Sequence, residues 1–221
     1  MSEAPSQETI IPMERGDLLS ILEVAAVVAF LLSYIWIIEP RSRAFAAPSF
    51  VLFFASAFLL HLRHNDRAAD LGIRLDTFSR ALKEALIVIL PAIVLAAGLG
   101  VFLGGSGALD PKQTALAFFW GYPWALFQQY GLQCVIGRRL TDVIPGDIAH
   151  DVTCAAIFGA LHLPNPFLTV VTSGAAYCFC ALFRRCPNLF ALALVHTLAS
   201  TLLYHFLPLA ITHSMRVGPG Y

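Results

Sequence analysis

The side chains of this sequence that could do chemistry are amides and imidazoles placed inside long apolar stretches. Three glutamines lie in the stretch Trp120–Leu140 and two histidines lie in two later stretches: Gln128, Gln129, Gln133, His162 and His196. An imidazole can act as a base, an acid or a metal ligand, whereas a carboxamide donates and accepts hydrogen bonds. Because polar groups in a hydrocarbon setting are costly without partners, we expect these five to share one internal site.

The composition indicates a membrane protein. The chain has 221 residues, of which 58% are hydrophobic and 13% are charged, against roughly a quarter charged in ordinary soluble domains. The formal net charge is zero, and we find no basic patch for nucleic acid and no glycine-rich phosphate loop. We therefore expect one membrane domain, with no nucleic-acid partner and an oligomeric state that the sequence leaves open.

The distribution of apolar residues predicts an all-α, polytopic transmembrane helix bundle. A membrane-spanning helix needs about 20 apolar residues. Seven candidate spans are present, at about 18–38, 44–62, 85–103, 114–136, 148–163, 167–183 and 189–207. The fifth is short and is broken at Pro164-Asn165-Pro166, so we expect it to end inside the protein beside a cavity.

The polar segments set the expected domain boundaries and the orientation. We expect a polar tail at 1–17, a single membrane domain at 18–207 with a cytoplasmic interfacial segment at 63–84, and a C-terminal tail at 208–221. Ten basic residues gather on one side of a seven-span bundle and four on the other. We expect the protein to lie in the cytoplasmic membrane, and the positive-inside rule then places its N-terminus on the cytoplasmic side.

Cofactor sites find little support in the residue spacing. A zinc ion between His162 and His196 would need a third ligand such as Cys134 or Cys154, and nothing in the spacing requires haem. The five cysteines lie in or beside apolar segments and are expected to be reduced, packed thiols. His61, His64 and His150 fall near loop ends and are expected to face water. We expect no metal and no other cofactor.

Three ordered motifs carry a family resemblance. They are Gln128-Gln129-xxx-Gln133, Phe158-xxx-His162 and His196-xxx-Ser200. The set resembles the CPBP (Abi, CAAX-protease-like) family of glutamic intramembrane proteases, which includes the prenyl-protein endopeptidases. That family carries two adjacent glutamates followed by an arginine, then Phe-xxx-His, then His-xxx-Asn or His-xxx-Asp. The resemblance covers about residues 71–207.

The departure from the family concerns the first motif. In the family a glutamate, helped by histidine, is proposed to activate water, which requires a base. Gln128 and Gln129 stand in place of the two glutamates, and a carboxamide is not a base near neutral pH. Gln133 stands in place of the arginine, so all three charges are exchanged together and no buried charge is left unpaired. The family's mechanism therefore does not transfer unchanged to this chain.

Two functions remain open at this point. The first is a divergent intramembrane enzyme with a neutral Gln/His cavity that acts on a lipid-like or lipid-anchored substrate. Its catalytic group would be His162, His196, Gln128 and Gln129, and its substrate-binding group would be Gln133, Asn165, Ser200, Phe158 and Trp124. The second is a pseudoprotease that binds or chaperones a hydrophobic client. Because ionisable groups inside membranes usually mark functional sites, we prefer a functional interpretation of the histidines to a purely structural one.

Overall fold

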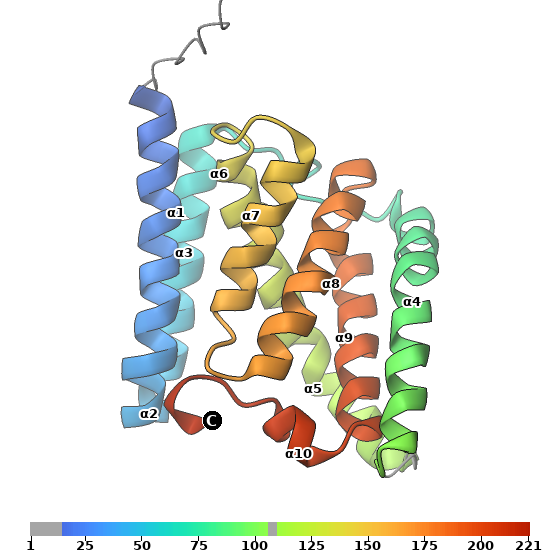
Figure 1. Ribbon diagram of the computed structural model, residues 1–221. Coiled ribbons are helices and arrows are strands. Elements are labelled where there is room, and N and C mark those ends of the chain that lie inside the picture. Colours follow the sequence, from blue (N-terminus) through green and yellow to red (C-terminus); the bar gives the residue numbers. More distant parts are fainter. Residues whose placement is uncertain (1–14, 106–109) are drawn as a thin grey trace, which may run out of the picture.

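The computed structural model describes residues 15–105 and 110–221, and it is helical throughout, with no strand in these ranges (Figure 1). Its long helices stand side by side as a bundle. Short π-helical and 3₁₀ segments lie between α1 and α3 and continue α5, and loops join most of the other helices. The elements are α1 Arg15–Ser33, η1 Tyr34–Ile38, α2 Glu39–Arg41, η2 Arg43–Phe45, α3 Ala46–His64, α4 Phe78–Phe102, α5 Pro111–Gln129, η3 Tyr130–Gly137, α6 Arg138–Leu140, α7 Asp147–Ala160, α8 Pro166–Arg185, α9 Leu189–Phe206, α10 Leu209–Thr212, η4 His213–Met215 and η5 Gly218–Gly220.

Five helical stretches in the described part are long and apolar enough to cross a membrane: Gly16–Arg41, Arg43–His64, Phe78–Phe102, Pro166–Arg185 and Leu189–Phe206. The all-α membrane bundle is thus confirmed. The fourth predicted span corresponds to α5 and η3, and the fifth to α7; neither is among the five stretches. A total of seven crossings therefore stays a prediction.

The predicted break after the fifth stretch is present. α7 has 14 residues, and the chain then reverses into α8, which packs along it. Asn165 caps α8, because its side chain accepts a hydrogen bond from the backbone N–H of Leu168 at 3.0 Å. The result is a helical hairpin whose tight turn carries His162.

The structure gives the local form of the two polar segments, while their place relative to a membrane stays a prediction. Within 63–84, α3 continues to His64 and α4 begins at Phe78. The intervening loop is fixed to the bundle: the carbonyl of Gly72 accepts from the backbone N–H of Leu189 at 2.9 Å. The segment 208–221 is structured and crosses one end of the bundle (Figure 1). Of the predicted tail 1–17, residues 1–14 lie outside the described residues.

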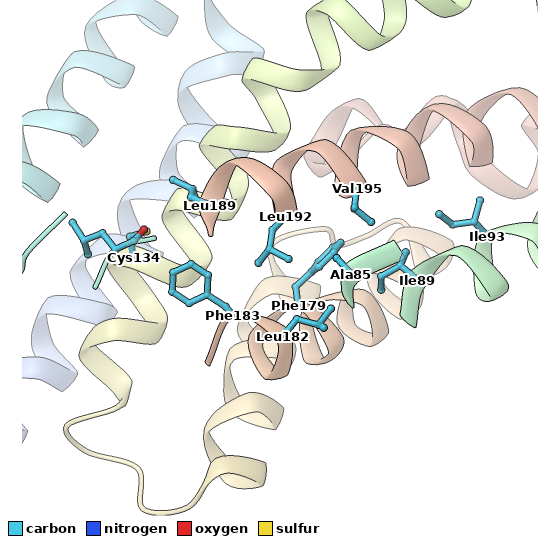
Figure 2. Packing of buried hydrophobic residues seen from close by; sticks show 11 residues of the cluster. Ala85, Ile89, Ile93, Cys134, Phe179, Leu182, Phe183, Leu189, Leu192 and Val195 are labelled. Atoms are coloured by element: carbon cyan, nitrogen blue, oxygen red, sulfur yellow. The ribbon is translucent and has the colours of Figure 1, made fainter. Parts of the chain in front are cut away.

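The largest buried cluster joins α4, α8 and α9. Figure 2 shows Phe179 and Leu182 of α8 facing Ile89 of α4, with Leu192 and Val195 of α9 beside them. Each fully buried side chain of this size contributes about 1.5–3 kcal/mol relative to exposure in water. Between helices in a bilayer this hydrophobic contribution is weaker, and close van der Waals packing holds the helices together.

The hairpin formed by α1 and α3 attaches to the rest of the bundle through two further clusters. Val24 of α1 packs with Leu132 and Ile136 of η3. Phe53 of α3 packs with Val135 of the same π-helical segment. Glu23 of α1 is 9% exposed and meets His64 of α3 at 2.9 Å. Both helices of the hairpin therefore rest on η3.

Close packing of α7 on α8 depends on a glycine, which gives a testable prediction. A Cβ on Gly159 would lie 1.9 Å from the Ser173 hydroxyl and 3.0 Å from the Thr169 carbonyl, whereas a Cβ on Gly174 would meet nothing within 4 Å. Gly159→Ala should therefore lower the melting temperature in detergent, with a cost of about 1–3 kcal/mol from overpacking. Gly174→Ala is the control and should raise or keep it, because alanine is the better helix former. Equal melting of the two variants would contradict this packing.

Candidate active site

A cavity of about 920 Å³ lies between the α1–α3 hairpin and the helices α5, α7, α8 and α9. This volume falls within the range of roughly 300–1,000 Å³ typical of small-molecule sites. Its walls are largely apolar and aromatic. Six of the predicted site residues line it: Trp124, Gln128, Phe158, His162, His196 and Ser200. Side chains from three separate stretches of the sequence thus meet at one site.

His162 lies on the turn that follows α7. Its Nδ1 is 2.7 Å from the carbonyl oxygen of Phe158, which can only accept, so Nδ1 carries the proton. The imidazole ring also packs on the Phe158 ring, with centroids 4.8 Å apart. The Phe-xxx-His spacing is therefore the spacing of one helical turn, and it leaves the Nε2 lone pair of His162 unused.

His196 lies in α9 and is bonded differently. Its Nδ1 is 3.2 Å from the Nε2 amide of Gln129, which donates to it. The Gln129 oxygen in turn accepts from the amide of Gln133 at 3.3 Å. Because Nδ1 accepts, the proton of a neutral His196 is on Nε2. The two glutamines thus fix the tautomer of His196.

The two histidines present unlike nitrogens. His162 offers a lone pair at Nε2 and His196 offers an N–H at Nε2. A neutral imidazole pair of this kind can accept a proton at one position and donate one at another. Gln128 lines the same cavity with an amide that can do both. The only acid among the described lining residues is Glu39, which belongs to α2 and not to this group.

Three predicted site residues do not line the cavity, and Ser200 lines it with its hydroxyl bonded to the backbone. Gln129 is fully buried and bonded to His196, and Gln133 is 5% exposed and bonded to Gln129. Asn165 does not line the cavity, and its amide donates to the carbonyls of Thr212 and Arg216 at 3.0 and 3.1 Å. Ser200 lines the cavity, but its hydroxyl donates to the Thr197 carbonyl at 3.1 Å. Among the described residues no three His, Cys, Asp or Glu side chains gather as a metal site would require.

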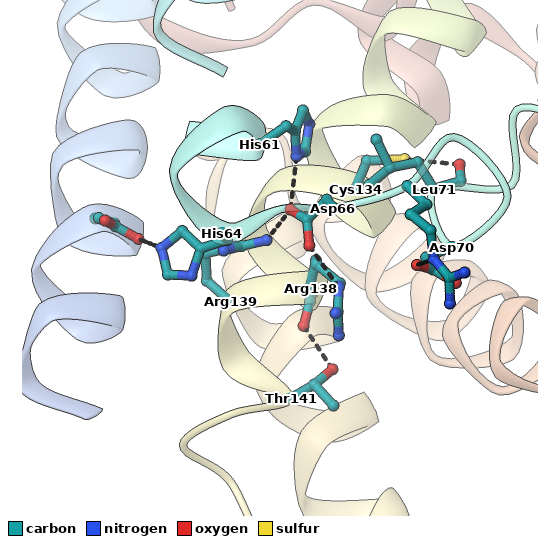
Figure 3. A network of polar contacts seen from close by, with 12 residues as sticks. His61, His64, Asp66, Asp70, Leu71, Cys134, Arg138, Arg139 and Thr141 are labelled. Carbon is teal, nitrogen blue, oxygen red and sulfur yellow. Dashed lines mark hydrogen bonds and ion pairs between the residues drawn. The ribbon is translucent and has the colours of Figure 1, made fainter. Parts of the chain in front are cut away.

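A polar network outside the cavity was not expected from the sequence. Asp66 follows Asn65, whose left-handed backbone (φ 54°) ends α3 and turns the chain back toward His61. The Asp66 side chain is fully buried. It accepts from His61 Nδ1 at 2.9 Å and from Arg138 at 3.0 Å, and it also pairs with Arg139 (Figure 3). One carboxylate therefore joins the end of α3 to α6.

This network holds the π-helical segment η3 along its length. At its start, the hydroxyl of Tyr130 is 2.9 Å from Nε2 of His61, the histidine bonded to Asp66. In its middle, the thiol of Cys134 donates to the Leu71 carbonyl at 3.2 Å (Figure 3). At its end lie Arg138 and Arg139. Because η3 carries Gln133, the loop after α3 positions the glutamine and histidine chain from outside the cavity.

The electrostatics of Asp66 favour its charged form. Burial alone would raise the pKa of the carboxyl, but the hydrogen bond from His61 and the charges of Arg139 and Arg138 outweigh it and lower the pKa below the usual 3.8. The stabilisation from this group is therefore present above its unfolded pKa. It is lost as the pH falls through the lower, folded value.

Two histidines expected to face water are buried instead. His61 is 8% exposed because it lies between Asp66 and Tyr130. His150 is 6% exposed because its ring lies against the Gly137 carbonyl at 2.9 Å and Asp151 at 3.1 Å. The sequence held one usable signal, since each histidine is followed by an aspartate within five residues.

Comparison with known families agrees with the helical membrane fold. Residues 131–202 match the family described as Rce1-like, Type II CAAX prenyl endopeptidase. No curated protein and no solved structure matches. The expected resemblance to the CAAX-protease-like family is thus confirmed for residues 131–202, on an all-helical membrane fold. The matched segment contains Gln133, His162 and His196 and begins just after Gln128 and Gln129.

The Asp66 network yields a prediction for stability. Asp66→Asn leaves Arg139, which is 2% exposed, without its counter-charge. Removing one partner of a buried pair costs about 3–5 kcal/mol, so the melting temperature in detergent at pH 7 should fall markedly. As the pH drops below about 4 the difference from wild type should narrow, because the wild-type carboxylate becomes protonated through its folded pKa.

The control for this experiment is Asp70→Asn. Asp70 pairs at 3.5 Å with Arg67, whose side chain is 85% exposed, and such surface pairs contribute about 0–1 kcal/mol. Its melting temperature should follow that of wild type at every pH. An Asp66→Asn protein that melts like Asp70→Asn would show that the network does not hold η3.

Proposed function

We propose that this protein is a divergent CAAX-protease-like intramembrane enzyme that acts on a lipid-like or lipid-anchored substrate. The observation that carries the proposal is the pair of histidines lining one apolar cavity with a free lone pair on His162 and a free N–H on His196. The match of residues 131–202 to the Rce1-like family supports it. The walls of the cavity suit a hydrocarbon chain.

The arrangement favours proton transfer without a carboxylate. His162 Nε2 takes a proton from the substrate, and His196 Nε2–H donates to the substrate atom that gains electron density. The Gln128 amide donates a further hydrogen bond to the same developing charge. Gln129 and Gln133 do not touch the substrate; they keep the Nδ1 of His196 unprotonated. Isomerisation, cyclisation and group transfer are reactions of this kind.

The family's glutamate-driven hydrolysis fits this site less well. Water attack on an amide needs a strong base beside the water, and Glu39 at the rim is the only carboxylate among the described lining residues. General acid–base catalysis by a positioned group contributes about 10²–10⁴-fold. That range sets the loss expected when one of the two histidines is removed.

The direct test compares lipid and peptide extracts of cells that express wild type, His162→Ala or His196→Ala at equal levels. We expect a product present only with wild type, and a precursor that accumulates with both variants. His213→Ala is the control, because His213 is exposed and outside the cavity lining. Identical extracts from correctly folded variants would contradict an enzymatic role.

The second candidate function is a binding module for a hydrophobic client. It is favoured by the apolar walls and by the hydrogen bonds that already occupy Gln129 and Gln133. Such a protein would hold its client without changing it. Bulky substitutions at Ala175 or Ala199, two small residues of the cavity lining, would then weaken client binding, while exchange of the histidines would leave every extract unchanged.

Gln129→Glu distinguishes the two functions. A carboxylate can only accept, so it draws the proton of His196 onto Nδ1 and converts Nε2 from donor to acceptor. Turnover should fall by about 10²-fold or more, the contribution of one general acid. Binding of a client should persist. Turnover at the wild-type level in a correctly folded Gln129→Glu protein would refute the assigned tautomers.

A further inference from the structure

The cavity has a second polar group at the end of the bundle formed by α2 and the C-terminal segment. Its members are Glu39 of α2, Arg43 of η2 and Arg216, which lies between η4 and η5. All three line the cavity and are exposed. They form a charged rim that is separate from the histidine and glutamine group.

Local structure fixes both arginines at this rim. Ser42 is extended and its hydroxyl accepts from the backbone N–H of Ala44, which starts the 3₁₀ turn that carries Arg43. The carbonyl of Arg216 is bonded by Asn165, so the position of its backbone does not depend on its own side chain. Further on, Gly218 (φ 65°) packs against Ile35 of η1, where a side chain would collide. The C-terminal segment thus spans from α8 to η1 (Figure 1).

The charges of the rim are available to a ligand. Neither Arg43 nor Arg216 forms an ion pair within residues 15–105 and 110–221, whereas Arg63 and Arg184 do. With Glu39 included, the three formal charges sum to +1. An arginine presents a planar fork of donors that matches a phosphate, and two such forks beside a single carboxylate leave a net positive charge that favours an anion.

One ligand can reach both polar groups. The carbonyl of Leu163, next to His162, accepts from the backbone N–H of Gly218 at 3.0 Å. Arg216 lies two residues before this contact. The same cavity has a continuous aromatic wall, in which the rings of Tyr34, Phe50, Trp124 and Phe127 contact one another. A molecule with an anionic head at the rim therefore has its apolar part against this wall, beside the histidines.

We propose that the cavity binds an amphiphile with a phosphate head group, which Arg43 and Arg216 hold at the rim while the hydrocarbon chain extends toward His162 and His196. This proposal names the class of substrate. It rests on the proposed function for the reaction, whereas binding of the amphiphile does not require turnover. Glu39 limits the affinity by repelling the phosphate. The phosphate serves as a handle for the arginines, and the groups that transfer protons meet the chain.

Binding of dodecyl phosphate to the purified protein in a neutral maltoside detergent tests the proposal by calorimetry. Arg43→Gln and Arg216→Gln should each weaken binding by about tenfold, since each removes a charge-assisted contact. Glu39→Gln should tighten binding. Arg41→Gln is the matched control: Arg41 is two residues from Arg43, bonds the Ile37 carbonyl and does not line the cavity. Its affinity should equal that of wild type.

Other probes define the chemistry that is recognised. Dodecanol should bind at least tenfold more weakly than dodecyl phosphate, and inorganic phosphate alone should not compete at equal concentration, because the chain supplies much of the binding. Dodecanoate binding as tight as dodecyl phosphate would overturn the choice of phosphate over carboxylate. Equal affinity of wild type and both arginine variants would overturn the proposal as a whole.

The outcome is separable from that of the proposed function. His162→Ala should bind dodecyl phosphate like wild type and yet lose turnover. Arginine-dependent binding in a protein without any turnover would support the phosphate site at the rim and contradict the enzymatic function. Turnover in a protein whose affinity for dodecyl phosphate does not depend on Arg43 and Arg216 would support the enzymatic function and contradict the phosphate site.

Discussion

A buried carboxylate is the constraint on which the arrangement of this bundle depends. Asp66 lies in a loop, yet its side chain is fully buried and meets His61, Arg138 and Arg139. An ion of this kind is tolerated only when every neighbour compensates it. Since those neighbours bracket η3, the loop, α3 and the π-helical segment form one unit. The α1–α3 hairpin and the glutamine chain both rest on that segment.

The histidine and glutamine group at the cavity differs from the Asp66 network, because its polar groups carry no charge. Gln133, Gln129 and His196 form a chain in which each amide has a defined donor and acceptor. A neutral chain of this kind needs no counter-ion. The charged groups thus lie towards the ends of the bundle, in the Asp66 network and at the rim. The glutamine and histidine chain inside the bundle is held by hydrogen bonds between neutral groups.

The sequence predicted what depends on local pattern. The apolar stretches gave the bundle, Pro164 to Pro166 gave the break, and the order of the motifs placed His162 and His196 in one cavity. The sequence did not predict the features that depend on contacts between segments far apart in the chain. Asp66 stands in a polar stretch that looks solvated, and nothing near it announces burial. The rim needs Arg43 and Arg216, 173 positions apart, and the second lies in a segment taken for a tail.

Asn165 ties the rim mechanically to the turn that carries His162. Its oxygen caps α8, while its nitrogen holds the carbonyls of Thr212 and Arg216. A displacement of the C-terminal segment therefore strains the start of α8, and a shift of the turn strains the segment in return. Such reciprocity is a coupling free energy between two sites. The rim and the turn that carries His162 are consequently coupled through the backbone, whether or not a ligand is bound.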